Sequence, residues 1–62
     1  MSMPLPAEIR AARRCAGLTK REAAELVSAS RRSWQDWEGG KAKMHPALWE
    51  LFLRKINDRR NK

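Results

Sequence analysis

Apolar side chains recur along the chain at the three- and four-residue spacing of helices, and no alternating run predicts a strand. Glycine and proline divide this pattern into segments, because glycine often ends a helix and proline often starts one. The segments expected to be helical are about Pro6–Ala16, Lys20–Val27, Arg31–Glu38 and Pro46–Asn57. We therefore expect an all-α fold of four to five short helices, followed by a polar, frayed tail over Asp58–Lys62.

Two of these segments have the length and separation of a helix-turn-helix. Thr19 and Glu22 form the sequence pattern of a capping box, which marks the start of one helix. Ser30 is a suitable N-cap for the next helix, and Gly39 with Gly40 ends it. Two helices of eight residues separated by three match the spacing of the motif. The sequence therefore predicts a helix-turn-helix over about residues 19–38.

The second helix of this motif has an apolar side and a polar side. At 100° per residue, Trp34 and Trp37 share one side, and we assign both to the core. The opposite side carries Arg31, Arg32, Gln35 and Asp36. Arg can bond guanine O6 and N7 together, and Gln can bond adenine N6 and N7, so this face suits the major groove of DNA. Asp36 is expected to accept from a cytosine amino group or to brace Arg32. The plainer alternative is a solvated helix face.

The chain is strongly basic for its length. Its 62 residues carry 14 Lys and Arg against 7 Asp and Glu, a formal net charge of +7 at pH 7. Such a charge attracts polyanions, above all nucleic acid. No apolar run approaches the roughly 20 residues of a membrane-spanning helix, and the start of the chain lacks the pattern of a secretory signal. Cys15, the single cysteine, cannot form an internal disulfide, so we expect a cytoplasmic protein with no membrane partner.

Catalytic chemistry has little support in the composition. The chain has one histidine, His45, and one cysteine, Cys15, which are too few for a structural zinc site or a catalytic constellation. We interpret Cys15 as a small core residue. A chain this short forms one domain, here residues 1–62, without room for a core and an active-site cleft. We therefore expect no enzyme activity, no metal and no cofactor.

The fourth segment is apolar around most of its circumference. Large apolar residues there include Leu48, Trp49, Leu51, Phe52, Leu53 and Ile56. A helix of this kind is buried on more than one side, which so short a chain does not achieve alone. We therefore expect residues 46–57 to form the dimerisation helix of a homodimer. The residues assigned to the seam are Trp49, Phe52, Leu53 and Ile56.

From Ile9 to about Lys43 the chain resembles the Cro and phage-repressor type of helix-turn-helix proteins, the XRE family with its lambda-repressor-like domain. The run Leu18–Val27 is similar to the family's second helix, and Ser30–Glu38 is similar to its recognition helix. The resemblance implies that Arg31, Arg32, Gln35 and Asp36 are the base-reading positions. It also implies a partly buried salt bridge between Arg13 and Glu38.

The same resemblance implies which residues touch the DNA backbone. It points to Lys20 at a helix start and to Lys41 and Lys43 in the loop after the recognition helix, and we assign Ser30 and Ser33 to the backbone as well. The chain departs from the family at Ser28, where most members have a glycine in the left-handed conformation. We expect this turn to be strained or shaped differently.

These observations together predict sequence-specific binding of double-stranded DNA by a homodimeric transcriptional repressor. Two recognition helices about 34 Å apart suit an inverted-repeat promoter site, and the protein is expected to regulate its own operon. Small repressors of this family occur in phages and mobile elements, including anti-CRISPR-associated regulators. The alternatives are an antitoxin-type protein-interaction module that also binds DNA, and a nonspecific binder of RNA or of membrane surfaces.

Overall fold

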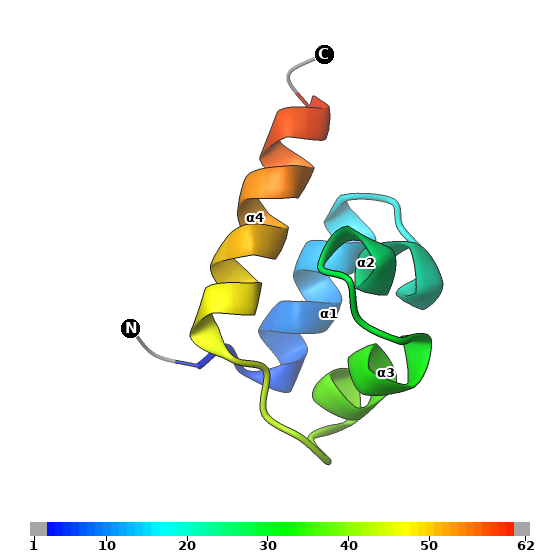
Figure 1. Cartoon of the computed structure of the whole chain (residues 1–62), viewed down its shortest axis with the longest axis vertical. Coiled ribbons are helices and arrows are strands. Elements are labelled where there is room, and N and C mark those ends of the chain that lie inside the picture. Colours follow the sequence, from blue (N-terminus) through cyan, green and yellow to red (C-terminus); the bar gives the residue numbers. More distant parts are fainter. Residues whose placement is uncertain (1–2, 61–62) are drawn as a thin grey trace.

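The computed structural model describes residues 3–60 of the chain, and all the regular structure in that part is helical (Figure 1). The helices are α1 (Pro6–Cys15), α2 (Lys20–Leu26), α3 (Arg31–Gly39) and α4 (Pro46–Arg60). In the view of Figure 1, α4 forms one side of the molecule, and α2 and α3 form the opposite side. The expected all-α fold is confirmed.

The last helix is longer than predicted. It continues to Arg60, so the expectation of a frayed tail from Asp58 onward is wrong for 58–60. Residues 61 and 62, the rest of that predicted tail, lie outside the described residues. The polar composition of this stretch misleads because an exposed last turn can remain helical when the preceding turns are packed.

Side-chain caps define the starts of α2 and α3. Thr19 Oγ1 accepts from the Glu22 amide at 3.1 Å, and the Thr19 amide donates to Glu22 Oε1 at 2.9 Å. The hydrogen bonds from Thr19, backbone first and then side chain, lower the pKa of the Glu22 carboxyl, and the charge of Arg59 adds to this effect. Ser30 Oγ accepts from the Ser33 amide at 3.1 Å, which caps α3. The boundaries of the helix-turn-helix therefore follow from local hydrogen bonds.

The core is centred on aromatic rings from α3 and α4. Trp34 is fully buried, and its ring lies 4.8 Å from that of Phe52 and 5.6 Å from that of Trp37, between ring centroids. Ile9 of α1 and Met44 of the loop before α4 complete the set of large buried side chains. The structure thus places both tryptophans of α3 on the inner side of that helix.

Two sequence assignments are corrected by this packing. Phe52, assigned to a dimer seam, is 0% exposed and packs on Trp34, so it belongs to the core of one chain. Cys15, interpreted as a core residue, is exposed and has a free thiol. It lies about 240° around α1 from Ile9, away from the side on which Ile9, Ala12 and Ala16 meet the core.

A shared carboxylate joins α1 to α3. Glu38 accepts from Arg13 Nε at 2.6 Å and from Arg13 Nη2 at 3.2 Å, and it also accepts from Trp34 Nε1. Arg13 Nη1 donates in addition to the Leu18 carbonyl at 3.0 Å, which reaches the turn before α2. The Glu38 side chain is 4% exposed and that of Arg13 15%. Two helices and a turn are therefore held by one charged pair.

The protonation of Glu38 follows from the same contacts. Burial alone raises the pKa of this carboxyl, but the hydrogen bonds from Arg13 and Trp34 and the charges of Arg13 and Lys20 outweigh it. The net pKa lies below the ordinary value of 4.5, so Glu38 is ionised at neutral pH.

The turn between α2 and α3 is strained at Ser28. Its φ is +56°, the left-handed conformation that favours glycine. The backbone of this turn is nevertheless closed, since the Ala29 amide donates to the Ala24 carbonyl at 2.9 Å. The sequence left two outcomes open, a strained turn or a turn of different shape. The turn keeps the left-handed shape, so Ser28 is in a strained backbone conformation.

Replacing Ser28 with glycine should remove this strain. We expect Ser28→Gly to raise the free energy of unfolding by about 0.5–1 kcal/mol. This is the energetic penalty of a left-handed serine, reduced by the larger conformational entropy that glycine has in the unfolded chain. Gly40, with φ +78° and room for a Cβ atom, is the matched control. Gly40→Ala should lower the free energy of unfolding by a similar amount. Urea denaturation measures both, and a neutral or destabilising Ser28→Gly would contradict the strain.

Breaking the pair between α1 and α3 should cost more than an exposed ion pair would. We expect Arg13→Met to lower the free energy of unfolding by about 2–4 kcal/mol, because it leaves a nearly buried carboxylate without its cation. In a double-mutant cycle with Glu38→Gln, the coupling energy should reach about 1 kcal/mol or more. Arg14→Met, at the exposed neighbour, should stay within about 0.5 kcal/mol of the wild type. A coupling energy near zero would show that the pair does not hold the helices together.

Candidate nucleic-acid interface

The outward face of α3 carries the residues that the sequence assigned to base reading. Arg31, Arg32 and Gln35 are exposed, whereas Asp36 is half-buried. Arg31 Nη1 donates to Gln35 Oε1 at 3.3 Å, so these two side chains lie together one turn apart. The face thus presents two guanidinium groups and an amide beside the first turns of the helix, groups that bond the edges of bases in a major groove.

Asp36 does not form the contact with Arg32 that was one of its two expected roles. Within residues 3–59, the ion pair of the structure is the one between Arg13 and Glu38. The Asp36 carbonyl instead accepts from the amides of Lys41 and Ala42, at 2.9 and 3.3 Å. Through these bonds the loop that follows α3 is fastened to the helix itself.

The lysines assigned to the DNA backbone differ in exposure. Lys41 and Lys43 are exposed in the loop between α3 and α4, on both sides of Ala42. Lys20 is half-buried at the first position of α2, near enough to Glu38 for its charge to lower the pKa of that carboxyl. A cation at a helix start is locally unfavourable, because the helix dipole is positive there. The three lysines, together with Arg31 and Arg32, gather positive charge around α3.

The two serines of the site have structural roles in the free protein. Ser30 Oγ accepts from the Ser33 amide and donates to Ser33 Oγ, each at 3.1 Å. Ser30 is exposed and Ser33 is half-buried. Capping of α3 therefore engages the Ser30 hydroxyl, and the role of either serine at a DNA backbone stays a prediction.

The residues assigned to a dimer seam separate into two groups. Phe52 is in the core, as described above, whereas Leu53 is 39% exposed and Trp49 and Ile56 are half-buried. Trp49 stacks on Phe52 with ring centroids 6.2 Å apart and planes at 21°. Their spacing of four and three residues places Trp49, Leu53 and Ile56 on one flank of α4. Leu51, 37% exposed, lies on the opposite flank.

Two contacts of this region were not predicted from the sequence. His45 Nδ1 accepts from the Ala47 amide at 3.0 Å and so caps the start of α4. Histidine is not among the usual N-cap residues, and only its position just before Pro46 signals the role. The hydrogen bond from Trp34 to Glu38 could have been predicted from the sequence spacing, because residues four apart meet on one helix face.

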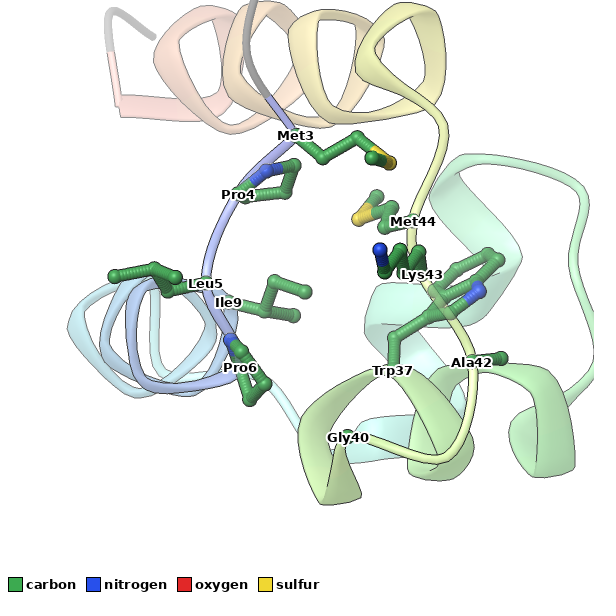
Figure 2. Close-up of a pocket in the computed structure, with 10 residues that line it drawn as sticks. All are labelled: Met3, Pro4, Leu5, Pro6, Ile9, Trp37, Gly40, Ala42, Lys43 and Met44. Carbon is green, nitrogen blue, oxygen red and sulfur yellow. The ribbon is translucent and has the colours of Figure 1, made fainter.

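An apolar pocket of about 360 Å³ lies between the start of the chain and the loop after α3 (Figure 2). Its walls come from four segments, and Lys43 is the one charged residue among the described residues that line it. The lining residues are Met3, Pro4, Leu5, Pro6, Ile9, Trp37, Gly40, Ala42, Lys43 and Met44. These described lining residues include no pair of acidic or basic groups suited to acid–base catalysis.

Metal-binding and membrane-spanning features are absent from the described part of the chain. Within residues 3–60, no three His, Cys, Asp or Glu side chains gather closely enough to hold a metal ion. None of the helices in that part has the length and apolar character needed to cross a membrane. The features that stand out are therefore the basic face of α3 with its loop, and the apolar pocket.

Comparison with known proteins agrees with this geometry. A family model described as "Helix-turn-helix domain" matches residues 5–56, which include all of α1, α2 and α3 and most of α4. The chain is also similar to the Type II methyltransferase M.MspI of a Moraxella species, with 41% identity over 44 residues. That stretch is 71% of this chain but only 10% of the methyltransferase. The similarity therefore concerns a small part of a much larger protein.

The family match covers well over half of the chain, and the structure places its two central helices at the separation that the motif requires. The chain therefore belongs to the DNA-binding helix-turn-helix domain family of XRE type.

Proposed function

We propose that the protein binds double-stranded DNA at a specific sequence and represses transcription as a homodimer. The observation that carries the proposal is the outward face of α3, where Arg31, Arg32 and Gln35 are exposed beside a loop with two exposed lysines. Arginine and glutamine suit base edges, and lysine suits phosphates, so the two parts of the surface match the two parts of a duplex. The protein acts in the cytoplasm by binding rather than by catalysis.

In this proposal, base reading and backbone binding belong to different residues. The base-reading residues are on α3, with Asp36 as a further contact to a cytosine amino group from its half-buried position. Lys41 and Lys43 neutralise phosphates next to the groove, and Lys20 does so at the start of α2. The bonds from the Asp36 carbonyl to the loop keep the lysines at a constant place relative to α3. Affinity and specificity are therefore separable by mutation.

The homodimer rests on the flank of α4 formed by Trp49, Leu53 and Ile56. Leu53 is among the most exposed large apolar residues of the described chain, and its two neighbours on the flank are only half-buried. A second copy related by a two-fold axis would cover this flank and would supply a second recognition helix. An inverted-repeat promoter site follows from that symmetry. Occupying such a site would exclude polymerase, and control of the protein's own operon needs nothing beyond its concentration.

The biological setting is proposed on resemblance alone. Small repressors of this family in phages and mobile elements, among them anti-CRISPR-associated regulators, suggest the same setting here.

The similarity to part of a Type II methyltransferase favours a second candidate, in which the domain serves as the DNA-binding part of a DNA-modifying protein. The two candidates differ in whether the domain alone represses a reporter from its own promoter. An antitoxin-type module, the further alternative, would instead co-purify with a partner protein.

Salt dependence should separate the lysines of the loop from the arginines of α3. Lys41→Gln and Lys43→Gln should each reduce the slope of log K against log salt by about one, with sequence preference unchanged. Arg32→Ala should cost about 1–3 kcal/mol on the selected site and relax the preference at one base position. Binding at several salt concentrations, with sites selected from random DNA, gives both quantities.

Arg54→Gln, at an exposed arginine on α4, is the control and should leave the slope and the preference unchanged. Equal losses on selected and random DNA for Arg32→Ala would mean that Arg32 contacts only phosphates. Equally strong binding to random RNA would contradict sequence-specific DNA binding altogether.

A charged residue in place of Leu53 should dissociate the dimer, whereas the same change at Leu51, on the other flank of α4, should not. Leu53→Glu should give a folded monomer, because Leu53 is 39% exposed and outside the core. Its affinity for an inverted repeat should fall steeply, since the two half-sites lose their linkage. Leu51→Glu, 37% exposed and about 200° away around α4, is a closely matched control that should remain a dimer. Sedimentation of both variants decides, and a wild type with the mass of one chain would rule out the dimer.

A further inference from the structure

We propose that the apolar pocket beside α3 binds a small amphipathic anion, a molecule with an apolar body and one carboxylate. The binding itself is independent of the proposed function. The effect on DNA binding that we derive from it rests on the proposed role of Lys43 at the DNA backbone. The pocket lies outside the base-reading face, and its size, walls and charge each restrict the ligand.

The size of the pocket suits a small molecule rather than a few waters. Its volume of about 360 Å³ lies within the range of about 300–1,000 Å³ that ligand sites occupy. An apolar chain of about ten carbons with a carboxylate is a small molecule of the kind that sites in this range hold.

The walls favour an apolar body. Ile9, Met44 and Trp37 are core residues, 1%, 0% and 8% exposed, that back the pocket, and Figure 2 shows Ile9 pointing from α1 into the space. Met3 and Met44 point toward one another across one end, and such thioether chains adapt to different shapes. Met3 and Leu5 are, with Leu51 and Leu53, the exposed large apolar side chains within residues 3–60. A ligand would cover apolar surface that is otherwise in water.

The charge of the lining favours an anion. Among the described residues of the lining, Lys43 is the one that carries a charge, and none is acidic and able to receive a cation. In Figure 2 the amine of Lys43 lies on the side of the loop that faces the hollow. A carboxylate at the rim would pair with this amine, while the net charge of +7 attracts anions to the molecule in general.

The position of the pocket links it to the DNA-binding surface. Gly40, Ala42 and Lys43 line it and belong to the loop that the Asp36 carbonyl fastens to α3. A bound carboxylate would neutralise the Lys43 amine that the proposed function assigns to a phosphate. Ligand and DNA would therefore compete for one charge, which makes the ligand an inhibitor of DNA binding.

Decanoate, below its micelle concentration and without DNA, is the probe for the site. At ordinary ligand efficiency its dissociation constant should be of the order of 1 mM, and the amides of Gly40, Ala42 and Lys43 should shift saturably in nitrogen–proton NMR spectra. Decanol, which has the same body without the charge, should bind about fivefold more weakly. Decylamine and acetate should cause no saturable shifts at these residues.

Two lysines of the same loop provide matched variants, because Lys43 lines the pocket and Lys41 does not. Lys43→Gln should weaken decanoate binding about fivefold and leave decanol binding unchanged. Lys41→Gln should change neither by more than about twofold. Circular dichroism confirms that both variants fold. Shifts confined to α4, no saturation with decanoate, or equal weakening by both variants would overturn the site.

The effect on DNA is measured separately. Saturating decanoate should lower the DNA affinity of the wild type by about the factor that Lys43→Gln causes, and it should have no further effect on that variant. An unchanged affinity would overturn the regulatory role while the NMR result stands by itself. Because the site is tested without DNA, its failure is distinguishable from a failure of the proposed function.

Discussion

The carboxylate of Glu38 lies where α1, α3 and the turn before α2 meet, and the orientation of α3 depends on it. It accepts hydrogen bonds from the guanidinium of Arg13 and from the indole of Trp34. The same guanidinium donates to the Leu18 carbonyl, so the first helix, the third helix and the turn share one group. With nine buried apolar residues in the core of the described chain, a small domain gains much of its definition from such a pair.

The basic face of α3 is a consequence of this arrangement. Trp34 is held by two contacts, a hydrogen bond from its ring nitrogen to Glu38 and the tilted ring of Phe52, 4.8 Å away between centroids. A helix fixed by its inner side presents its outer residues in one orientation, and Arg31 with Gln35 then forms a contact of its own. Positioning of this kind is what a base-reading surface requires, since bidentate contacts tolerate little displacement.

Local rules predict much of this fold, and they fail where packing decides. Thr19 and Ser30 mark helix starts through bonds to residues three positions away, and both caps are present. Phe52 was assigned wrongly because α4 is apolar around most of its circumference, so periodicity cannot say which residue faces the core. Cys15 was misjudged because its residue type was weighed above its position, about 240° around α1 from Ile9. The end of α4 was misjudged because helix length depends on packing by residues far away in the chain. The pocket could not be predicted at all, since its walls come from the first residues, α1, α3 and a loop.

The two hydrogen-bond partners of Glu38 also determine which molecule, protein or DNA, would change its conformation on binding. One carboxylate that serves donors on two helices allows neither helix to slide without breaking a charged hydrogen bond. A reading element that does not adjust leaves the adjustment to the duplex, whose bending and groove width depend on its own sequence. Base pairs that this chain never touches would then contribute to selectivity through the stiffness of the DNA alone.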